Sequence, residues 1–136
     1  MTTNPRGLTA LVVEDEPLIG RVCQRTLAAI GFGVDIAPSN LIARRMVAEK
    51  HYDLCLSDIR TPYMSGIELY EYLAQAQPAL AGRTIFTTGD VLSDQIESFL
   101  AGTGQPFLAK PFTPEELQRA ARQLCGGLTA PSYASV

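Results

Sequence analysis

Five polar residues stand at or directly after apolar runs, where buried strands are expected to end: Glu14, Asp15, Asp58, Thr88 and Lys110. Three carboxylates that meet in one place repel one another unless a cation compensates them. A hard divalent cation such as Mg²⁺ takes oxygen ligands, and the lysine adds one more positive charge. A metal, a lysine, a hydroxyl and a free carboxylate together suit phosphoryl transfer onto the carboxylate, because the cations neutralise charge on the phosphoryl oxygens.

The pattern of the chain predicts the elements that would bring these residues together. Apolar runs alternate with segments of helical spacing, which is typical of a parallel sheet covered by helices on both faces. Five units fit either common doubly wound strand order and favour the flavodoxin-like order 2-1-3-4-5, in which the carboxyl ends of strands one, three, four and five lie side by side. Strands are expected at residues 8–13, 33–37, 52–57, 83–88 and 105–109, and five helices at about 17–30, 40–47, 67–76, 94–100 and 114–124.

Local signals mark where several of these helices begin. Thr113, Pro114 and Glu116 form the pattern of a capping box with proline in the first turn. Ser39 and Ser93 are candidate caps of two further helices.

The composition limits the classes of function. A length of 136 residues suggests one domain, and a net charge of -3 argues against nucleic-acid binding by this chain alone. The three cysteines have no metal-like spacing, so we expect reduced thiols in a cytoplasmic protein, with Cys55 buried. No apolar run is long enough to span a membrane, and the N-terminus lacks the layout of a signal peptide.

Four motifs then resemble one known family. They are residues 13–16 (Val-Glu-Asp-Glu), Asp58 with residues 62–66 (Pro-Tyr-Met-Ser-Gly), residues 87–90 (Thr-Thr-Gly-Asp) and residues 110–112 (Lys-Pro-Phe). Their order and spacing resemble the receiver domains of response regulators, the phosphorylated switches of two-component signalling. The resemblance covers roughly residues 8–125, which leaves 1–7 as an N-terminal extension and 126–136 as a tail or linker.

The resemblance implies a role for each site residue. Asp58 accepts a phosphoryl group from a phosphohistidine donor. Glu14, Asp15 and Asp58 bind Mg²⁺ together with the backbone carbonyl of Arg60. Lys110 pairs with the phosphoryl group.

The resemblance also implies how the signal leaves the site. Thr88 bonds a phosphoryl oxygen, Phe107 matches the rotating aromatic residue of the switch, and the Lys110–Pro111 peptide is cis. The expected partners are a histidine kinase or a histidine phosphotransfer protein, with a possible homodimer through the face of the fourth helix, fifth strand and fifth helix. No nucleic acid, no membrane and no enzymatic activity are expected of this chain.

Simpler interpretations exist for each residue taken alone. Asp58 could cap a turn, and Glu14 with Asp15 could open a helix in solvent. Lys110 could be a surface lysine, Phe107 could be core alone, and Thr87 competes with Thr88 because strand alternation points only one of them at the site.

Other functions also have to be weighed. A receiver that acts without phosphorylation would usually lack the acceptor, the lysine or the acidic pair, and this chain retains them. A phosphatase resembling the haloacid dehalogenases carries an Asp two residues after the nucleophile, where this chain has Arg60. A flavin carrier would need a glycine- and hydroxyl-rich loop after the first strand. The chain could be a single-domain regulator or the receiver of a hybrid histidine kinase, and its fifth-strand region slightly favours the latter.

Overall fold

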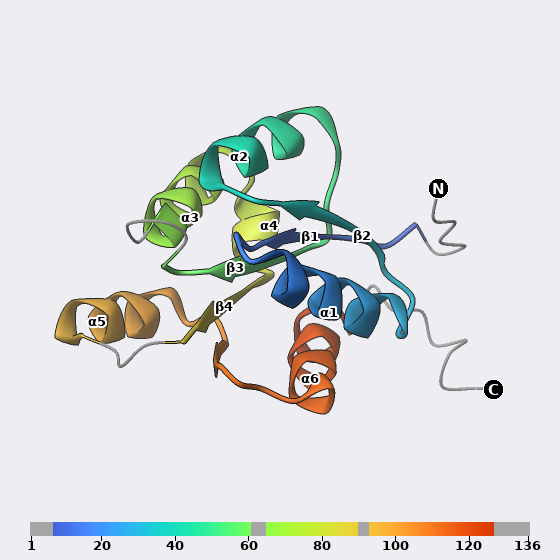
Figure 1. Cartoon of the computed structure of the whole chain (residues 1–136). Coiled ribbons are helices and arrows are strands. Elements are labelled where there is room, and N and C mark those ends of the chain that lie inside the picture. The colour runs from blue at the N-terminus through green and yellow to red at the C-terminus, as the bar shows by residue number, and fades with distance from the viewer. Residues whose placement is uncertain (1–6, 61–64, 90–92, 127–136) are drawn as a thin grey trace.

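A five-stranded parallel sheet forms the centre of the computed structural model, which describes residues 7–60, 65–89 and 93–126. The strand order is β2-β1-β3-β4-β5 (Figure 1), so the predicted flavodoxin-like order is confirmed. The strands are β1 Thr9–Val13, β2 Gly33–Ala37, β3 Leu54–Asp58, β4 Thr84–Thr88 and β5 Phe107–Ala109.

Helices cover both faces of this sheet, as Figure 1 shows. α1 and α6 share one apolar cluster with the sheet, and α2, α3 and α4 share another. α5 packs beside α3 and β4 through a third cluster, built around Phe86 and Ile96. The bounds are α1 Pro17–Ala28, α2 Asn40–Glu49, α3 Ser65–Ala76, α4 Pro78–Ala81, α5 Asp94–Thr103 and α6 Pro114–Cys125.

The central strand β3 has all five residues buried, because helices lie against both of its faces. Leu54 and Leu56 point to the cluster of α1 and α6, whereas Cys55 between them points to the cluster of α2, α3 and α4. This burial fixes the register of the strand that ends in Asp58.

Two helices differ from the sequence prediction. The sequence does not predict the short helix α4. Pro78, before which α3 is expected to stop, also occupies the first turn of a new helix that buries Leu80 and Ala81. The described part of the chain therefore contains six helices rather than the five expected. α5 continues to Thr103 and ends at Gly104, whose φ of 70° is the left-handed conformation that glycine adopts readily.

The predicted caps are confirmed. Thr113 and Glu116 exchange hydrogen bonds of 3.1 and 2.7 Å in a capping box, and the hydroxyls of Ser39 and Ser93 accept from amides of α2 and α5. All three cysteines are free and buried. Within the described residues, no helix combines the length and the apolarity that crossing a membrane requires.

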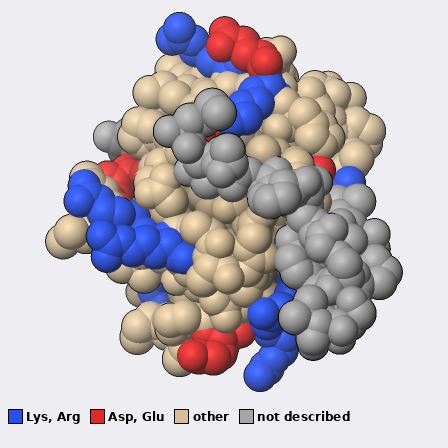
Figure 2. All heavy atoms as spheres, turned by 90° about the vertical axis from the view of Figure 1, so that its right-hand side faces the viewer, with Lys and Arg blue, Asp and Glu red and all other residues tan. Residues whose placement is uncertain are grey.

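Charged side chains are dispersed over the face drawn in Figure 2. On the face in Figure 2, Lys and Arg atoms form several separate groups with Asp and Glu groups among them. No single basic stripe runs across the part of this face that the structure describes.

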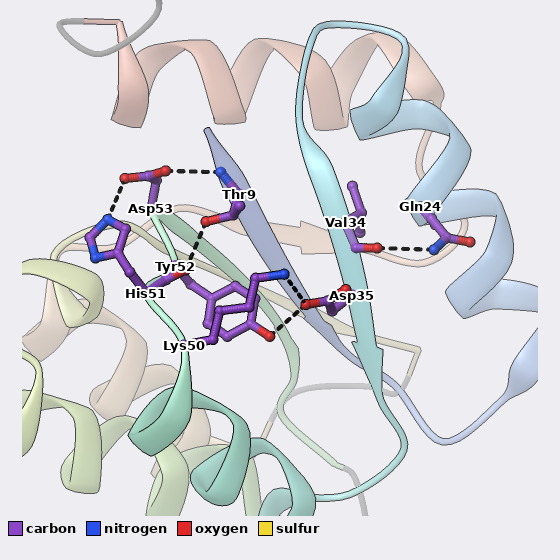
Figure 3. A network of polar contacts seen from close by, with 8 residues as sticks. All are labelled: Thr9, Gln24, Val34, Asp35, Lys50, His51, Tyr52 and Asp53. Carbon is purple, nitrogen blue, oxygen red and sulfur yellow. Dashed lines mark hydrogen bonds and ion pairs between the residues drawn. The ribbon is translucent and has the colours of Figure 1, made fainter. Parts of the chain in front are cut away.

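A network of polar contacts closes the amino-terminal end of the sheet, opposite the predicted site (Figure 3). The buried Asp53 carboxylate accepts from the Thr9 amide at 2.8 Å and pairs with His51 at 2.8 Å. Nearby, Asp35 of β2 accepts from Lys50 at 2.9 Å and from the Tyr52 hydroxyl at 2.7 Å. These contacts tie β1 and β2 to the segment that leads into β3.

Candidate functional site

The predicted site residues lie at the carboxyl ends of adjacent strands. Glu14 directly follows β1, Asp58 is the last residue of β3, and Lys110 directly follows β5. β1 pairs with β3 up to Val13 and Ser57, so the next residues of the two strands, Glu14 and Asp58, stay side by side. Parallel pairing therefore brings together residues that are 44 and 52 positions apart in the chain.

Three carboxylates meet at this edge of the sheet. One carboxylate oxygen from each of Glu14, Asp15 and Asp58 lies within 4.8 Å of the other two. Glu14 and Asp58 are buried, whereas Asp15 is exposed and opens the cluster to solvent. A set of carboxylate oxygens with one open side fits a hard divalent cation that keeps part of its water shell, as Mg²⁺ does.

Lys110 joins two of these carboxylates. Its ammonium nitrogen lies 2.9 Å from Glu14 Oε1 and 2.8 Å from Asp58 Oδ2, and its side chain is only 17% exposed. The backbone holds the lysine in place, because the Lys110 amide donates to the Thr88 carbonyl at 2.8 Å. The Lys110–Pro111 peptide is cis, as predicted. The interpretation of Lys110 as a surface lysine is therefore wrong.

Backbone amides hold the second oxygen of each buried carboxylate. Asp58 Oδ1 accepts from the Arg60 amide at 2.9 Å, and Glu14 Oε2 accepts from the Glu16 amide at 3.2 Å. The contact at Asp58 is the turn-capping bond of the simpler interpretation, and it coexists with the ion pair on the other oxygen. Both carboxylates are thus oriented before any ligand arrives.

Burial disfavours the charged forms of Glu14 and Lys110, whereas the ion pairs of Lys110 favour them. Burial raises the pKa of Glu14, and the hydrogen bond from Lys110 only partly offsets this effect. Burial alone would lower the pKa of Lys110, but its hydrogen bonds to Asp58 and Glu14 outweigh burial and raise the pKa. The lysine therefore stays charged between the carboxylates.

Gly66 is a positioning residue that the motif contained but to which sequence analysis assigned no role. A side chain there would place Cβ 2.5 Å from Ile59 Cα and 2.9 Å from the Asp58 carbonyl oxygen. The Gly66 amide also donates to the Ile59 carbonyl at 3.3 Å. Only glycine lets the first turn of α3 lie this close to the backbone of the acceptor strand.

The remaining predicted residues lie around this centre. Thr87 pairs with Asp58 across the β3–β4 ladder, and Thr88 is buried at the next position. Phe107 of β5 is half-buried against the cluster that contains Ile59 and Phe86. The roles of Thr88, of Phe107 and of the Arg60 carbonyl stay predictions. Residues 62–64 of the loop motif and Asp90 lie outside the described residues.

Curated relatives of this chain include regulators and a sensor. The chain is 34% identical over 108 residues to the probable transcriptional regulator ycf29 of Porphyra purpurea, which covers 79% of this chain and 51% of that protein. It is 30% identical over 122 residues to the sensor protein EvgS of Escherichia coli, which covers 90% of this chain and 10% of that protein. The chain thus spans about half the length, or less, of these curated relatives.

Solved structures share the fold. A CheY-like response regulator receiver domain protein from Methanospirillum hungatei superposes with a TM-score of 0.80 at 24% identity, over 89% of this chain and 95% of that one. The response regulator TrrA from Thermotoga maritima, solved in complex with Mg²⁺-BeF, superposes with a TM-score of 0.74 at 25% identity, over 86% of this chain and 98% of that one. The family model described as "Response regulator receiver domain" matches residues 10–122. With the fold and the strand-end cluster, this match establishes that the chain belongs to the receiver domain family of two-component response regulators.

Proposed function

We propose that Asp58 is the phosphoacceptor of this receiver domain and takes its phosphoryl group from a phosphohistidine on a histidine kinase or phosphotransfer protein. The observation that carries this proposal is the position of the Asp58 carboxylate, 2.8 Å from the Lys110 ammonium and within the cluster of three carboxylates. A carboxylate that is oriented beside a fixed cation suits nucleophilic attack on a phosphoryl group.

The side chains divide the work of the transfer. Asp58 supplies the attacking oxygen, and Lys110 neutralises charge on the phosphoryl oxygens while it stays anchored through its own backbone amide. We assign Glu14, Asp15, Asp58 and the Arg60 carbonyl to hold Mg²⁺, as the acidic cluster and the Mg²⁺-bound relative TrrA support. When bound, the metal neutralises and orients the phosphoryl oxygens.

The switch is assigned to Thr88 and Phe107. The Thr88 hydroxyl moves inward to bond a phosphoryl oxygen once it is present, and Phe107 turns toward the space that this movement leaves. The surface that changes on phosphorylation and binds the downstream partner consists of α5, β5 and α6. It also serves as the homodimer surface if two copies associate.

The wider assignments follow from charge and family. The chain acts as a cytoplasmic signalling module rather than an enzyme. It receives its phosphoryl group within a phosphorelay and passes the signal to partner proteins by binding them. The dispersed charges of Figure 2 and the net charge of -3 support the absence of nucleic-acid binding. Residues 8–125 form the receiver unit, with 1–7 as an extension and 126–136 as a tail or linker. Retention of Asp58, Lys110 and the acidic pair disfavours the phosphorylation-independent alternative.

The test is intact-mass measurement after incubation with acetyl phosphate and Mg²⁺. The wild-type chain is expected to gain one phosphoryl group, and Asp58→Asn to gain none, because an amide is a poor nucleophile. Excess chelator is expected to stop the labelling of the wild type. An equal mass gain in Asp58→Asn would refute the acceptor, and full-rate labelling in chelator would refute the metal.

A further inference from the structure

An apolar groove runs beside the acceptor site, outside the machinery assigned so far. It has a volume of about 410 Å³ and lies between the first turns of α1 and the segment that follows β5. Leu18 and Val22 of α1 form one wall, although they are 77% and 58% exposed. Pro111 and Phe112 form the opposite wall.

The groove shares one residue with the site. Lys110 lines it, and the Lys110 ammonium is the group that contacts Asp58 at 2.8 Å. Gly89, which directly follows β4, also lines the groove and contributes no side chain to its wall. Lys110 therefore lies between the groove and the acceptor, because the residue lines the groove while its ammonium contacts Asp58.

We propose that this groove binds the apolar leaving group of small phosphodonors, so that the domain accepts phosphate faster from an aromatic acyl phosphate than from an aliphatic one. This inference rests on the proposed function of Asp58. In the reaction, a carboxylate oxygen of Asp58 forms a bond to phosphorus. The bond between phosphorus and the donor's carboxylate oxygen breaks, and the arene carboxylate departs with that electron pair. No proton or redox partner is required.

Size and charge favour this occupant. Apolar cavities of about 150 Å³ hold a benzene ring, so a groove of 410 Å³ admits an aromatic ring and its carboxyl carbon. The phosphoryl dianion suits the Lys110 ammonium beside Asp58, and the ring suits the exposed apolar pair Leu18 and Val22. In an in-line displacement the leaving group stands on the far side of phosphorus from Asp58.

The experiment compares benzoyl phosphate with acetyl phosphate, both in Mg²⁺. The rate of Asp58 labelling with each donor is divided by that donor's spontaneous hydrolysis rate, which removes the difference in intrinsic reactivity. The benzoyl-to-acetyl ratio is expected to be about ten-fold higher in the wild type than in the double variant Leu18→Ser, Val22→Ser, a discrimination typical of apolar pockets. Leu41→Ser is the matched control, because Leu41 is an exposed leucine of α2 (72%) that does not line the groove.

A second measurement does not depend on phosphorylation. Phenylphosphonate is expected to shift the methyl resonances of Leu18 and Val22, whereas methylphosphonate is expected to leave them in place. Equal ratios in the wild type and the double variant, or methyl shifts that do not distinguish the two phosphonates, would overturn the groove. Failure of both donors to label Asp58 would overturn the proposed function instead. The phosphonate titration alone would then decide whether the groove binds an aromatic group.

Discussion

Replacing Lys110 with methionine tests whether the acidic cluster depends on its internal cation. Methionine keeps an unbranched apolar chain but removes the ammonium that lies 2.9 Å from Glu14 and 2.8 Å from Asp58. Both carboxylates are at least nine-tenths buried at the side chain, so neither can recover its hydration in place of the lost partner. Breaking a buried pair in this way costs about 3–5 kcal/mol of unfolding free energy.

Lys50 provides a matched control on the other side of the fold. Its ammonium lies 2.9 Å from Asp35, nearly the same distance as in the pairs of Lys110, but the two side chains are 52% and 37% exposed. Solvent screens such a pair, and its removal costs about 0.2–1 kcal/mol. Lys50→Met is therefore expected to lose several-fold less stability than Lys110→Met, although the contact distances match.

Urea unfolding with and without Mg²⁺ separates the two effects. Without Mg²⁺ each variant shows its full loss, and at an Mg²⁺ concentration 100 times the Kd a ligand adds about 2.7 kcal/mol to the folded state. Mg²⁺ is expected to narrow the gap between Lys110→Met and the wild type, because the metal compensates the orphaned carboxylates, and to leave the Lys50→Met gap unchanged. Equal losses in the two variants, or equal effects of Mg²⁺ on both gaps, would refute the electrostatic account of the cluster.

Four further outcomes are expected. Burial raises the pKa of the Cys23 and Cys125 thiols to about 11 and that of the Cys55 thiol to about 12. The native protein should therefore react slowly with a disulfide reagent at pH 8, and the unfolded chain quickly. Burial alone would raise the pKa of Asp35, but hydrogen bonds from Lys50 and Tyr52 lower it below the ordinary 3.8, so the ionised carboxylate should stabilise the fold above that pH and lose this effect below it. Urea unfolding from pH 6 to 2.5 should show the difference in unfolding free energy between wild type and Asp35→Asn shrinking as the pH falls. A difference that grew in acid would contradict the lowered pKa. We expect α5 to open more readily than the other helices, because it buries only Ile96 and Leu100. Its amides should therefore exchange faster than those of α1 and α3, and equal protection would contradict this expectation. Thr88→Ala should accept phosphate at Asp58 yet show reduced chemical-shift changes on α5, β5 and α6, and a full set of changes would exclude Thr88 as the relay.

Local signals in the sequence were sufficient for the positions of the site residues. Apolar runs followed by a charged residue place Glu14, Asp58 and Lys110 at strand ends, and parallel pairing then leaves little choice about where they meet. The capping box of Thr113 and Glu116 was equally predictable, because all of its partners lie within four residues.

Features that depend on contacts distant in sequence were not predictable. The helix α4 depends on the burial of Leu80 and Ala81 against the sheet, which no local pattern around Pro78 reveals. The requirement for glycine at position 66 arises from the backbone of Ile59, seven residues earlier, after the chain has turned back. The groove likewise depends on α1 facing the segment after β5, about 90 residues away in the chain.

The energy available at the site limits how the domain can switch. Three carboxylates face one ammonium at the sheet edge, so a phosphoryl group, which adds about -1.5 to -2 charges, enters a region already rich in negative charge. Driving a two-state equilibrium from 1:99 to 99:1 requires about 5.5 kcal/mol of differential interaction. The bonds that a phosphoryl group forms with a lysine and a hydroxyl are worth about 1.5–3 kcal/mol each. Lys110 is already held by Glu14 and Asp58, so part of its new bond only replaces an old one. We therefore expect a bond from the Thr88 hydroxyl and the charge compensation of Mg²⁺ to supply much of the difference, so that the switch depends on both together.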